Sequence, residues 1–136
     1  MNTVNLESKI IALPKLEDDR GNLSFLQNFD QIPFEIKRLY WIYDVPSGES
    51  RGGHAYYKLE ELIIALSGSF DVVADDGTKK EKYHLNSSNQ GCYIPMLFWR
   101  EIKNFSTNAI ALIVSSREYN ANDYIYDYNV FKNITK

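Results

Sequence analysis

The chain has 136 residues, a formal net charge of -3, one cysteine and two histidines. This length is typical of one domain, residues 1–136, built around a single core. The lone Cys92 excludes an intrachain disulfide, and no apolar run reaches the ~18 residues that a membrane span needs. The start of the chain has no basic stretch followed by an apolar one, so we expect a cytoplasmic protein rather than a secreted one.

The acidic balance argues against a protein that binds nucleic acid by neutralising phosphates over a broad face. A small anionic ligand is a different case, because a few arginines gathered in one pocket are enough to bind it. We therefore expect no nucleic-acid partner and keep a phosphorylated metabolite as a possible ligand class.

Short segments rich in β-branched and aromatic residues recur along the chain and are separated by Gly, Pro, Asn and Asp. In chain order, the predicted strands are residues 10–13, 23–27, 36–44, 61–66, 70–74, 81–85, 91–94, 98–105 and 109–115. Such a number of short strands predicts an all-β sandwich or barrel. We expect Trp41, Phe98 and Trp99 in its core.

Turn residues at 67–69 and 75–77 flank the apolar run 70–74, so the middle of the chain is predicted to form an antiparallel meander. From Asn120 onward the pattern changes to helical spacing. It predicts one or two short helices on the outside of the barrel, with Tyr124, Tyr128 and Phe131 on one packing face.

Residues 51–60, RGGHAYYKLE, concentrate unusual chemistry. If this segment is extended, alternate side chains share one face, which carries His54, Tyr56, Lys58 and Glu60. An imidazole, a phenol, an ammonium and a carboxylate do not make a core-forming face. The two glycines before His54 permit an irregular backbone or the close approach of a ligand, and the segment therefore predicts a pocket.

This segment and a later one resemble the two motifs of the cupin family. The first family motif runs Gly, His-x-His, three or four residues, Glu, about six residues, Gly; here it reads Gly53, His54-x-Tyr56, Glu60, Gly68. The second ends in His-x3-Asn after a Gly and a Pro, and here it reads Gly91, Pro95, Arg100-x3-Asn104. The resemblance implies a double-stranded β-helix, or jelly roll, with short C-terminal helices.

Metal-binding cupins hold their ion with three histidines and one glutamate, and two of those histidines are Tyr56 and Arg100 here. A guanidinium has no lone pair to donate and repels a nearby cation. We therefore expect a site without a metal and without another cofactor.

Within the cupins, residues 19–21, 32–77, 91–102 and 122–133 resemble the WxcM-like sugar-nucleotide 3,4-ketoisomerases that act on dTDP-4-keto-6-deoxyglucose. The resemblance implies a dTDP-linked 4-keto-6-deoxyhexose as substrate and a homodimer with an exchanged N-terminal strand. It also implies a role in making 3-amino-3,6-dideoxyhexoses for bacterial surface glycans.

The resemblance implies that His54 is the catalytic base. The family pattern at this strand is RGxHAHK, so Tyr56 stands where a second histidine is expected. A neutral imidazole can take the proton from C3, and an arginine or the Tyr56 hydroxyl can stabilise the enediolate oxygen that results. The candidate substrate-binding residues are Arg20, Arg38, Tyr40, Arg51 and Arg100.

Two alternatives remain open at this point. Loss of the second histidine is consistent with a cupin that binds a nucleotide sugar without converting it. A histidine and tyrosine pair is also consistent with a cupin of the 3,5-epimerase type.

Overall fold

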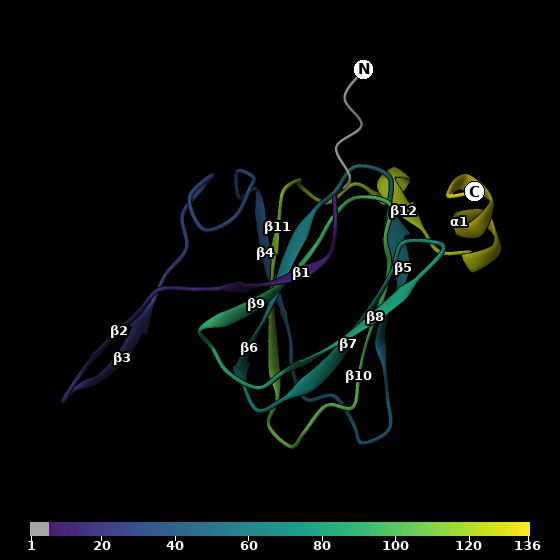
Figure 1. Cartoon of the computed structure of the whole chain (residues 1–136). Coiled ribbons are helices and arrows are strands. Elements are labelled where there is room, and N and C mark those ends of the chain that lie inside the picture. The colour runs from purple at the N-terminus through teal and green to yellow at the C-terminus, as the bar shows by residue number, and fades with distance from the viewer. Residues whose placement is uncertain (1–5) are drawn as a thin grey trace.

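The computed structural model describes residues 6–136; residues 1–5, on which part of the secretion-signal expectation depends, lie outside the described chain. Two five-stranded antiparallel sheets face each other and enclose the core (Figure 1). The first sheet has the order β1 (Lys9–Ala12), β9 (Gln90–Ile94), β6 (Glu61–Ser67), β11 (Ile110–Ser115) and β4 (Arg38–Ile42). The second has the order β12 (Tyr124–Ile125), β5 (Arg51–Tyr56), β10 (Trp99–Lys103), β7 (Phe70–Asp75) and β8 (Lys80–Leu85). The predicted all-β jelly roll is confirmed.

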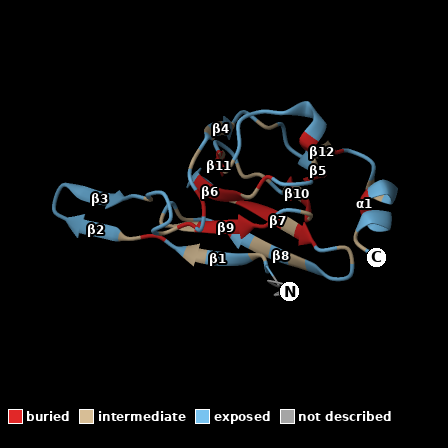
Figure 2. Ribbon diagram, turned by 90° about the horizontal axis from the view of Figure 1, so that it is seen from above, coloured by how far each residue is buried: buried red, intermediate tan, exposed pale blue. Residues whose placement is uncertain are grey.

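The two faces of β6 show how the sequence builds this arrangement. Ile63 and Ala65 point into the core between the sheets, where they meet apolar residues of both sheets. Leu62 and Ile64 point to the other side and pack against Ile32 and other apolar residues of the segment that precedes β4. Both faces of the strand are therefore buried, which explains its uninterrupted apolar run. Figure 2 shows the buried residues concentrated in these central strands.

Every strand predicted from residue ranges overlaps an observed strand, but the predicted meander is wrong. The 67–69 connection carries the chain from β6 in one sheet to β7 in the other, and these strands are not paired. Gly68 adopts a φ of +67° at this crossing, and a Cβ there would lie 2.8 Å from the Cα of Ala109. The 75–77 turn does join a hydrogen-bonded hairpin, β7 to β8.

The tail forms a short 3-10 helix, η1 (Ala121–Asp123), then β12 and the helix α1 (Tyr128–Ile134). Tyr128 and Phe131 pack against Trp99, with ring centroids 5.1 Å and 5.9 Å from it, as expected of a packing face. Tyr124 is not on a helix. It pairs with Tyr56 on β5, because backbone pairing with that strand prevails over the helical spacing of the tyrosines.

The hairpin of β2 (Lys15–Asp18) and β3 (Gly21–Ser24) projects from the body, and its strand residues are exposed throughout (Figures 1 and 2). β2 was not predicted. The first strand, β1, pairs with β9 of its own chain. Trp41 is 60% exposed on the outer side of β4, so its predicted place in the core is wrong, whereas Phe98 and Trp99 are buried.

Among the described residues, no helix has both the length and the apolar character required to cross a membrane.

Candidate active site

A cavity of about 560 Å³ opens between the two sheets. Most of the predicted site residues line it, namely Arg38, Tyr40, Arg51, His54, Tyr56 and Arg100. Arg20 does not. It follows β2 at the tip of the projecting hairpin, where its guanidinium binds the Asp18 carboxylate at 2.7 Å. A single chain therefore brings six of the seven predicted residues together.

An irregularity in β5 turns His54 toward the cavity. Gly52 and Gly53 have φ values of +89° and +68°, and the pairing of β5 with β10 shifts register between Arg100 and Glu101. A Cβ on Gly52 would lie 3.0 Å from the carbonyl oxygen of Arg100. The glycines are required by this bulge, and a bulge of this kind redirects the side chain that follows it.

His54 and Tyr56 form the chemical centre of the cavity. Nε2 of His54 and the Tyr56 hydroxyl share a hydrogen bond of 3.0 Å, and the two rings meet edge to face with centroids 4.8 Å apart. The Tyr56 side chain is fully buried. The pair can pass a proton between a nitrogen and an oxygen that are already in contact.

Burial sets the protonation state of this pair. Loss of water around His54 lowers its pKa from 6.5 to about 4, and the positive charge of Arg100 acts in the same direction. Burial raises the pKa of the Tyr56 phenol, and the nearby Glu61 carboxylate adds to the rise. At neutral pH the site therefore holds a neutral imidazole and a neutral phenol.

This shift predicts a loss of stability in acid that depends on His54. Between pH 6.5 and 4 the unfolded chain protonates this imidazole and the folded chain does not, so the free energy of unfolding falls as the pH falls. The contribution is roughly 3 kcal/mol over that interval. Denaturant unfolding of the wild type and His54→Asn at pH 7 and pH 4 measures it. Parallel losses in the two proteins would contradict the shift.

The same-face prediction for residues 54–60 holds only as far as Tyr56, where β5 ends. Beyond it, the backbone N–H of Lys58 donates to Asp123, and the Glu60 carboxylate accepts a hydrogen bond from Tyr93, outside the cavity. Glu61 lines the cavity instead. Four residues separate Tyr56 from Glu61, so Glu61 also fits the first cupin motif, and it takes the place assigned to Glu60.

Glu61 and Arg100 form an ion pair at the floor of the cavity. Nη1 of Arg100 lies 2.5 Å from the Glu61 carboxylate, and both side chains are 1% exposed. Nη2 of Arg100 donates to the Phe98 carbonyl oxygen at 2.9 Å. The Nε–H of Arg100 is buried and has no hydrogen-bond partner within the described chain.

A second guanidinium, that of Arg38, lies among tyrosines on another wall. Its Cζ is 4.7 Å from the Tyr40 ring centroid and 5.5 Å from that of Tyr119, and Nη2 donates to the Tyr124 hydroxyl at 3.4 Å. Tyr126 stacks on Tyr124 with a centroid distance of 5.3 Å. No carboxylate is within ion-pairing distance of Arg38 among the described residues, so its charge is available to an anionic ligand.

The sequence prediction missed four titratable residues of the lining: Glu61, Tyr119, Tyr124 and Tyr126. Tyr124 and Tyr126 can be recognised from their spacing of two residues, because alternate side chains of a strand point to the same face. Glu61 was read only as the start of an apolar strand.

The donor set does not fit the metal ion that many cupins hold. No group of three His, Cys, Asp or Glu side chains gathers anywhere in residues 6–136. In the cavity the Glu61 carboxylate is already neutralised by the Arg100 guanidinium, which would repel a cation. The groups that this cavity offers for chemistry are therefore protein side chains.

The fold and cavity define a cupin whose site is built from a histidine, tyrosines and arginines. Residues 6–136 match the family model described as FdtA, WxcM-like, C-terminal. The chain is 38% identical over 127 residues to the TDP-4-oxo-6-deoxy-alpha-D-glucose-3,4-oxoisomerase of Aneurinibacillus thermoaerophilus, covering 93% of this chain and 91% of that protein.

Two solved structures are similar to this chain in both sequence and fold. A 3,4-ketoisomerase from Helicobacter canadensis is 40% identical, with a TM-score of 0.92 and coverage of 96% and 98% of the two chains. A variant of a Thermoanaerobacterium thermosaccharolyticum 3,4-ketoisomerase, solved with TDP-4-keto-6-deoxyglucose, is 30% identical, with a TM-score of 0.91 and coverage of 94% and 93%. The chain belongs to the WxcM-like FdtA family, and it is an isomerase.

Proposed function

We propose that the protein is a sugar-nucleotide 3,4-ketoisomerase that converts dTDP-4-keto-6-deoxyglucose into a dTDP-3-keto-6-deoxyhexose. The observation that carries this proposal is the His54 imidazole, hydrogen-bonded to Tyr56 inside a cavity that also presents the Arg38 guanidinium, which no described carboxylate neutralises. The likeness to the 3,4-ketoisomerases supports the same reaction.

The reaction moves one proton from carbon to carbon. His54 removes the C3 proton, which the adjacent C4 ketone makes acidic, and the electrons move onto the C4 oxygen to give an enediolate. A proton is then added to C4, and the proton of the C3 hydroxyl passes to the C4 oxygen, so that the ketone is at C3 and the hydroxyl at C4. The Tyr56 hydroxyl is in contact with His54 and is therefore placed to act as a proton donor in this step.

The nucleotide binds through the arginine and tyrosine wall. A diphosphate requires positive charge, which Arg38 supplies from inside the cavity and Arg51 from its exposed edge. Tyr40 and the stacked pair Tyr124 and Tyr126 offer flat faces for the base and sugar.

The test is proton exchange at carbon. The protein is incubated with dTDP-4-keto-6-deoxyglucose in D2O, and the sugar protons are followed by NMR. Loss of the C3 proton signal with formation of a 3-keto product supports the proposal. Saturable shifts of the ligand signals without exchange would instead indicate a non-catalytic binding protein, and additional exchange at C5 would indicate a 3,5-epimerase.

Tyr56→Phe tests whether the phenol transfers a proton. The variant keeps the ring against Arg100 but removes the hydroxyl that contacts His54. We expect kcat to fall by about 10- to 1000-fold if the phenol transfers a proton. Steady-state kinetics measures the change. A loss below about threefold would show that Tyr56 contributes packing rather than proton transfer.

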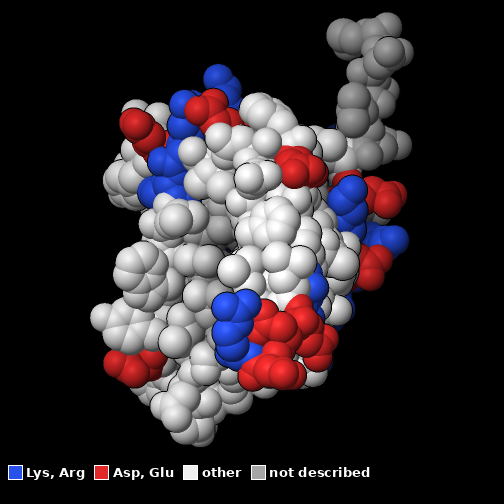
Figure 3. All heavy atoms as spheres, turned by 90° about the vertical axis from the view of Figure 1, so that its left-hand side faces the viewer, with Lys and Arg blue, Asp and Glu red and all other residues white. Residues whose placement is uncertain are grey.

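We also propose that the protein is a homodimer to which the N-terminal segment contributes. Because β1 pairs within its own chain, the segment that can reach a second copy is the hairpin of β2 and β3. An isolated two-stranded hairpin is marginally stable in water, and Leu16 and Leu23 on this one are 60% and 55% exposed. Figure 3, which views the hairpin side, shows a broad uncharged area with charged side chains toward its edges.

In such a dimer, Arg20 belongs to the cavity of the other copy. Co-expression of Arg20→Ala with His54→Asn tests this arrangement, because mixed dimers then contain one cavity with both residues intact. Recovery of activity above that of either variant supports the exchange. A monomeric mass in solution would contradict it.

The proposed product would be consumed in the cytoplasm by an aminotransferase that makes a 3-amino-3,6-dideoxyhexose for a surface glycan, such as the O-antigen of lipopolysaccharide. Deletion of the protein is expected to remove that amino sugar from hydrolysed surface glycan.

A further inference from the structure

The buried ion pair of Glu61 and Arg100 connects the two sheets beneath the cavity. Glu61 lies on β6 of the first sheet and Arg100 on β10 of the second. Removing two charges from water is costly, so such a pair is a weak source of stability. What it does provide is a fixed geometry, because each partner restricts the position of the other.

Glu61 acts on the His54–Tyr56 pair through Arg100. With Nη1 on Glu61 and Nη2 on the Phe98 carbonyl, the guanidinium plane is fixed at both ends. Its Cζ lies 4.8 Å from the centroid of the Tyr56 ring, and the hydroxyl of that ring contacts His54. A continuous series of contacts thus leads from the carboxylate to the imidazole.

The charge of Glu61 is as important as its hydrogen bond. Arg100 is the backbone partner of His54 across the paired strands β10 and β5, so an uncompensated guanidinium there would oppose protonation of the imidazole. Among the described lining residues, Glu61 is the single carboxylate. The titratable and charged groups that line the cavity with His54 are Arg38 and Tyr40 from β4, Arg51 and Tyr56 from its own strand, Glu61 from β6, Arg100 from β10, and Tyr119, Tyr124 and Tyr126 from the C-terminal segment.

We propose that Glu61 is a positioning residue of this site, which holds the Arg100 guanidinium against Tyr56 and cancels its charge next to the base. The proposal rests on the proposed isomerase function for its kinetic consequence. The effect of Glu61 on the position and charge environment of the His54–Tyr56 pair concerns the protein without substrate. The two parts can therefore be tested separately.

Glu61→Gln is the direct test, and Glu60→Gln is its matched control, because the neighbouring carboxylate lies outside the cavity on Tyr93. In Glu61→Gln we expect kcat to fall at least tenfold, while Kd for TDP changes less than twofold. We also expect the acid limb of the kcat/KM profile to move at least half a pH unit lower. Glu60→Gln is expected to show none of these changes.

Histidine NMR gives a readout without substrate. The chain has two histidines, so 15N-histidine labelling gives one imidazole in the cavity and one, His84, on an edge strand against Asp71. Glu61→Gln should shift the His54 ring signals at pH 7 and leave those of His84 in place. Wild-type His54 signals and wild-type kcat in Glu61→Gln would overturn the proposal.

If Glu61→Gln fails to fold because Arg100 is left unpaired, Glu61→Asp keeps the test available. Aspartate retains the charge but withdraws the carboxylate by one methylene. We expect the acid limb to stay within about 0.2 pH units and kcat to fall at least fivefold; an unchanged kcat would overturn the positioning role. A wild-type protein that leaves the sugar nucleotide unconverted would refute the proposed function, while the NMR comparison would still decide the role of Glu61.

Discussion

Replacing His54 with asparagine is expected to reduce kcat by roughly 1000-fold or more, because the variant removes the proposed base for the C3 proton. Asparagine is polar and of similar shape, and His54 is only partly buried, so the fold should persist. Turnover of dTDP-4-keto-6-deoxyglucose and the thermal unfolding midpoint at pH 7 are measured on the same preparation.

His84→Asn is the matched control for this variant. His84 is the other histidine of the chain; its side chain is 58% exposed and binds Asp71 on the outer side of the second sheet. It is expected to leave kcat within twofold of the wild type. Activity in His54→Asn comparable to that of His84→Asn would mean that another group removes the C3 proton.

The protonation state of the base could not have been predicted from the sequence in detail. An unperturbed imidazole is already mostly neutral at pH 7, so the sequence alone is consistent with His54 as a base. The fall of its pKa to about 4 depends on burial and on Arg100, which lies 46 positions later in the chain and is placed beside it by strand pairing. Local spacing carries no information about such a contact.

The fold was easier to predict than the site, and particular residues show why. Alternating and continuous apolar runs, as in β6 and β11, identify strands directly. They do not reveal which sheet a strand joins, and the 67–69 crossing was accordingly read as a hairpin. The prediction for Trp41 is wrong for a related reason. The sequence places an aromatic residue in a strand, but it does not show which face of that strand is covered.

The arginines of the site also show which features a sequence predicts and which it does not. Arg38 and Tyr40 are both predicted site residues, two positions apart on the predicted strand 36–44, and their side chains contact each other in the cavity. Arg100 is a predicted substrate-binding residue, and in the protein without substrate its Nη groups bind Glu61 and the Phe98 carbonyl oxygen. The sequence identifies the residue types that a pocket contains, whereas their availability depends on partners from distant strands.

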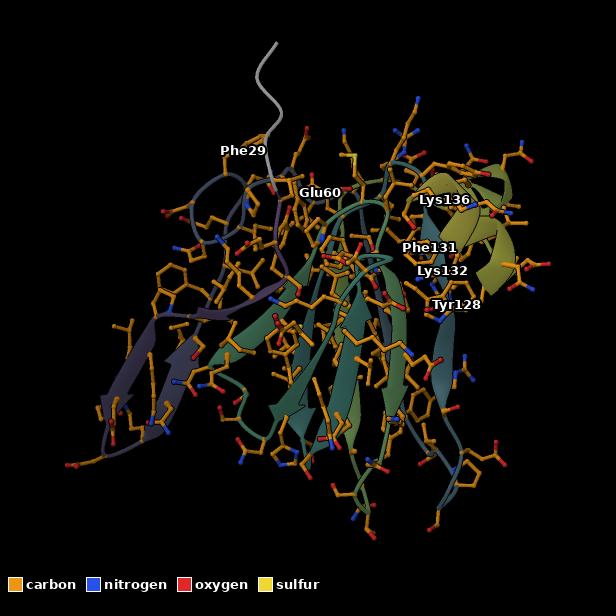
Figure 4. All side chains as sticks on the ribbon, turned by 45° about the vertical axis from the view of Figure 1, so that its right-hand side comes forward. Phe29, Glu60, Tyr128, Phe131, Lys132 and Lys136 are labelled. Carbon is orange, nitrogen blue, oxygen red and sulfur yellow. The ribbon has the colours of Figure 1, made fainter. Side chains whose placement is uncertain are left out.

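Phe131 is the buried residue of the C-terminal helix, and Phe131→Ala is expected to cost about 4 kcal/mol of unfolding free energy. Phe131 is fully buried on the inner side of α1 against Ala55, Trp99 and Ile125 (Figure 4). A helix of seven residues is not stable alone in water, so its order depends on this packing.

The same packing supports the site, because Ile125 is part of β12, the strand that also presents Tyr124 to the cavity. We therefore expect Phe131→Ala to lower the unfolding midpoint by roughly 15 °C and to weaken TDP binding about tenfold. Calorimetry and titration of TDP measure the two effects. Val130→Ala is the control, since Val130 is the preceding residue and is 43% exposed. If the two variants unfold at the same temperature, α1 is not held by Phe131, and the C-terminal tyrosines must be positioned by the pairing of β12 with β5 alone.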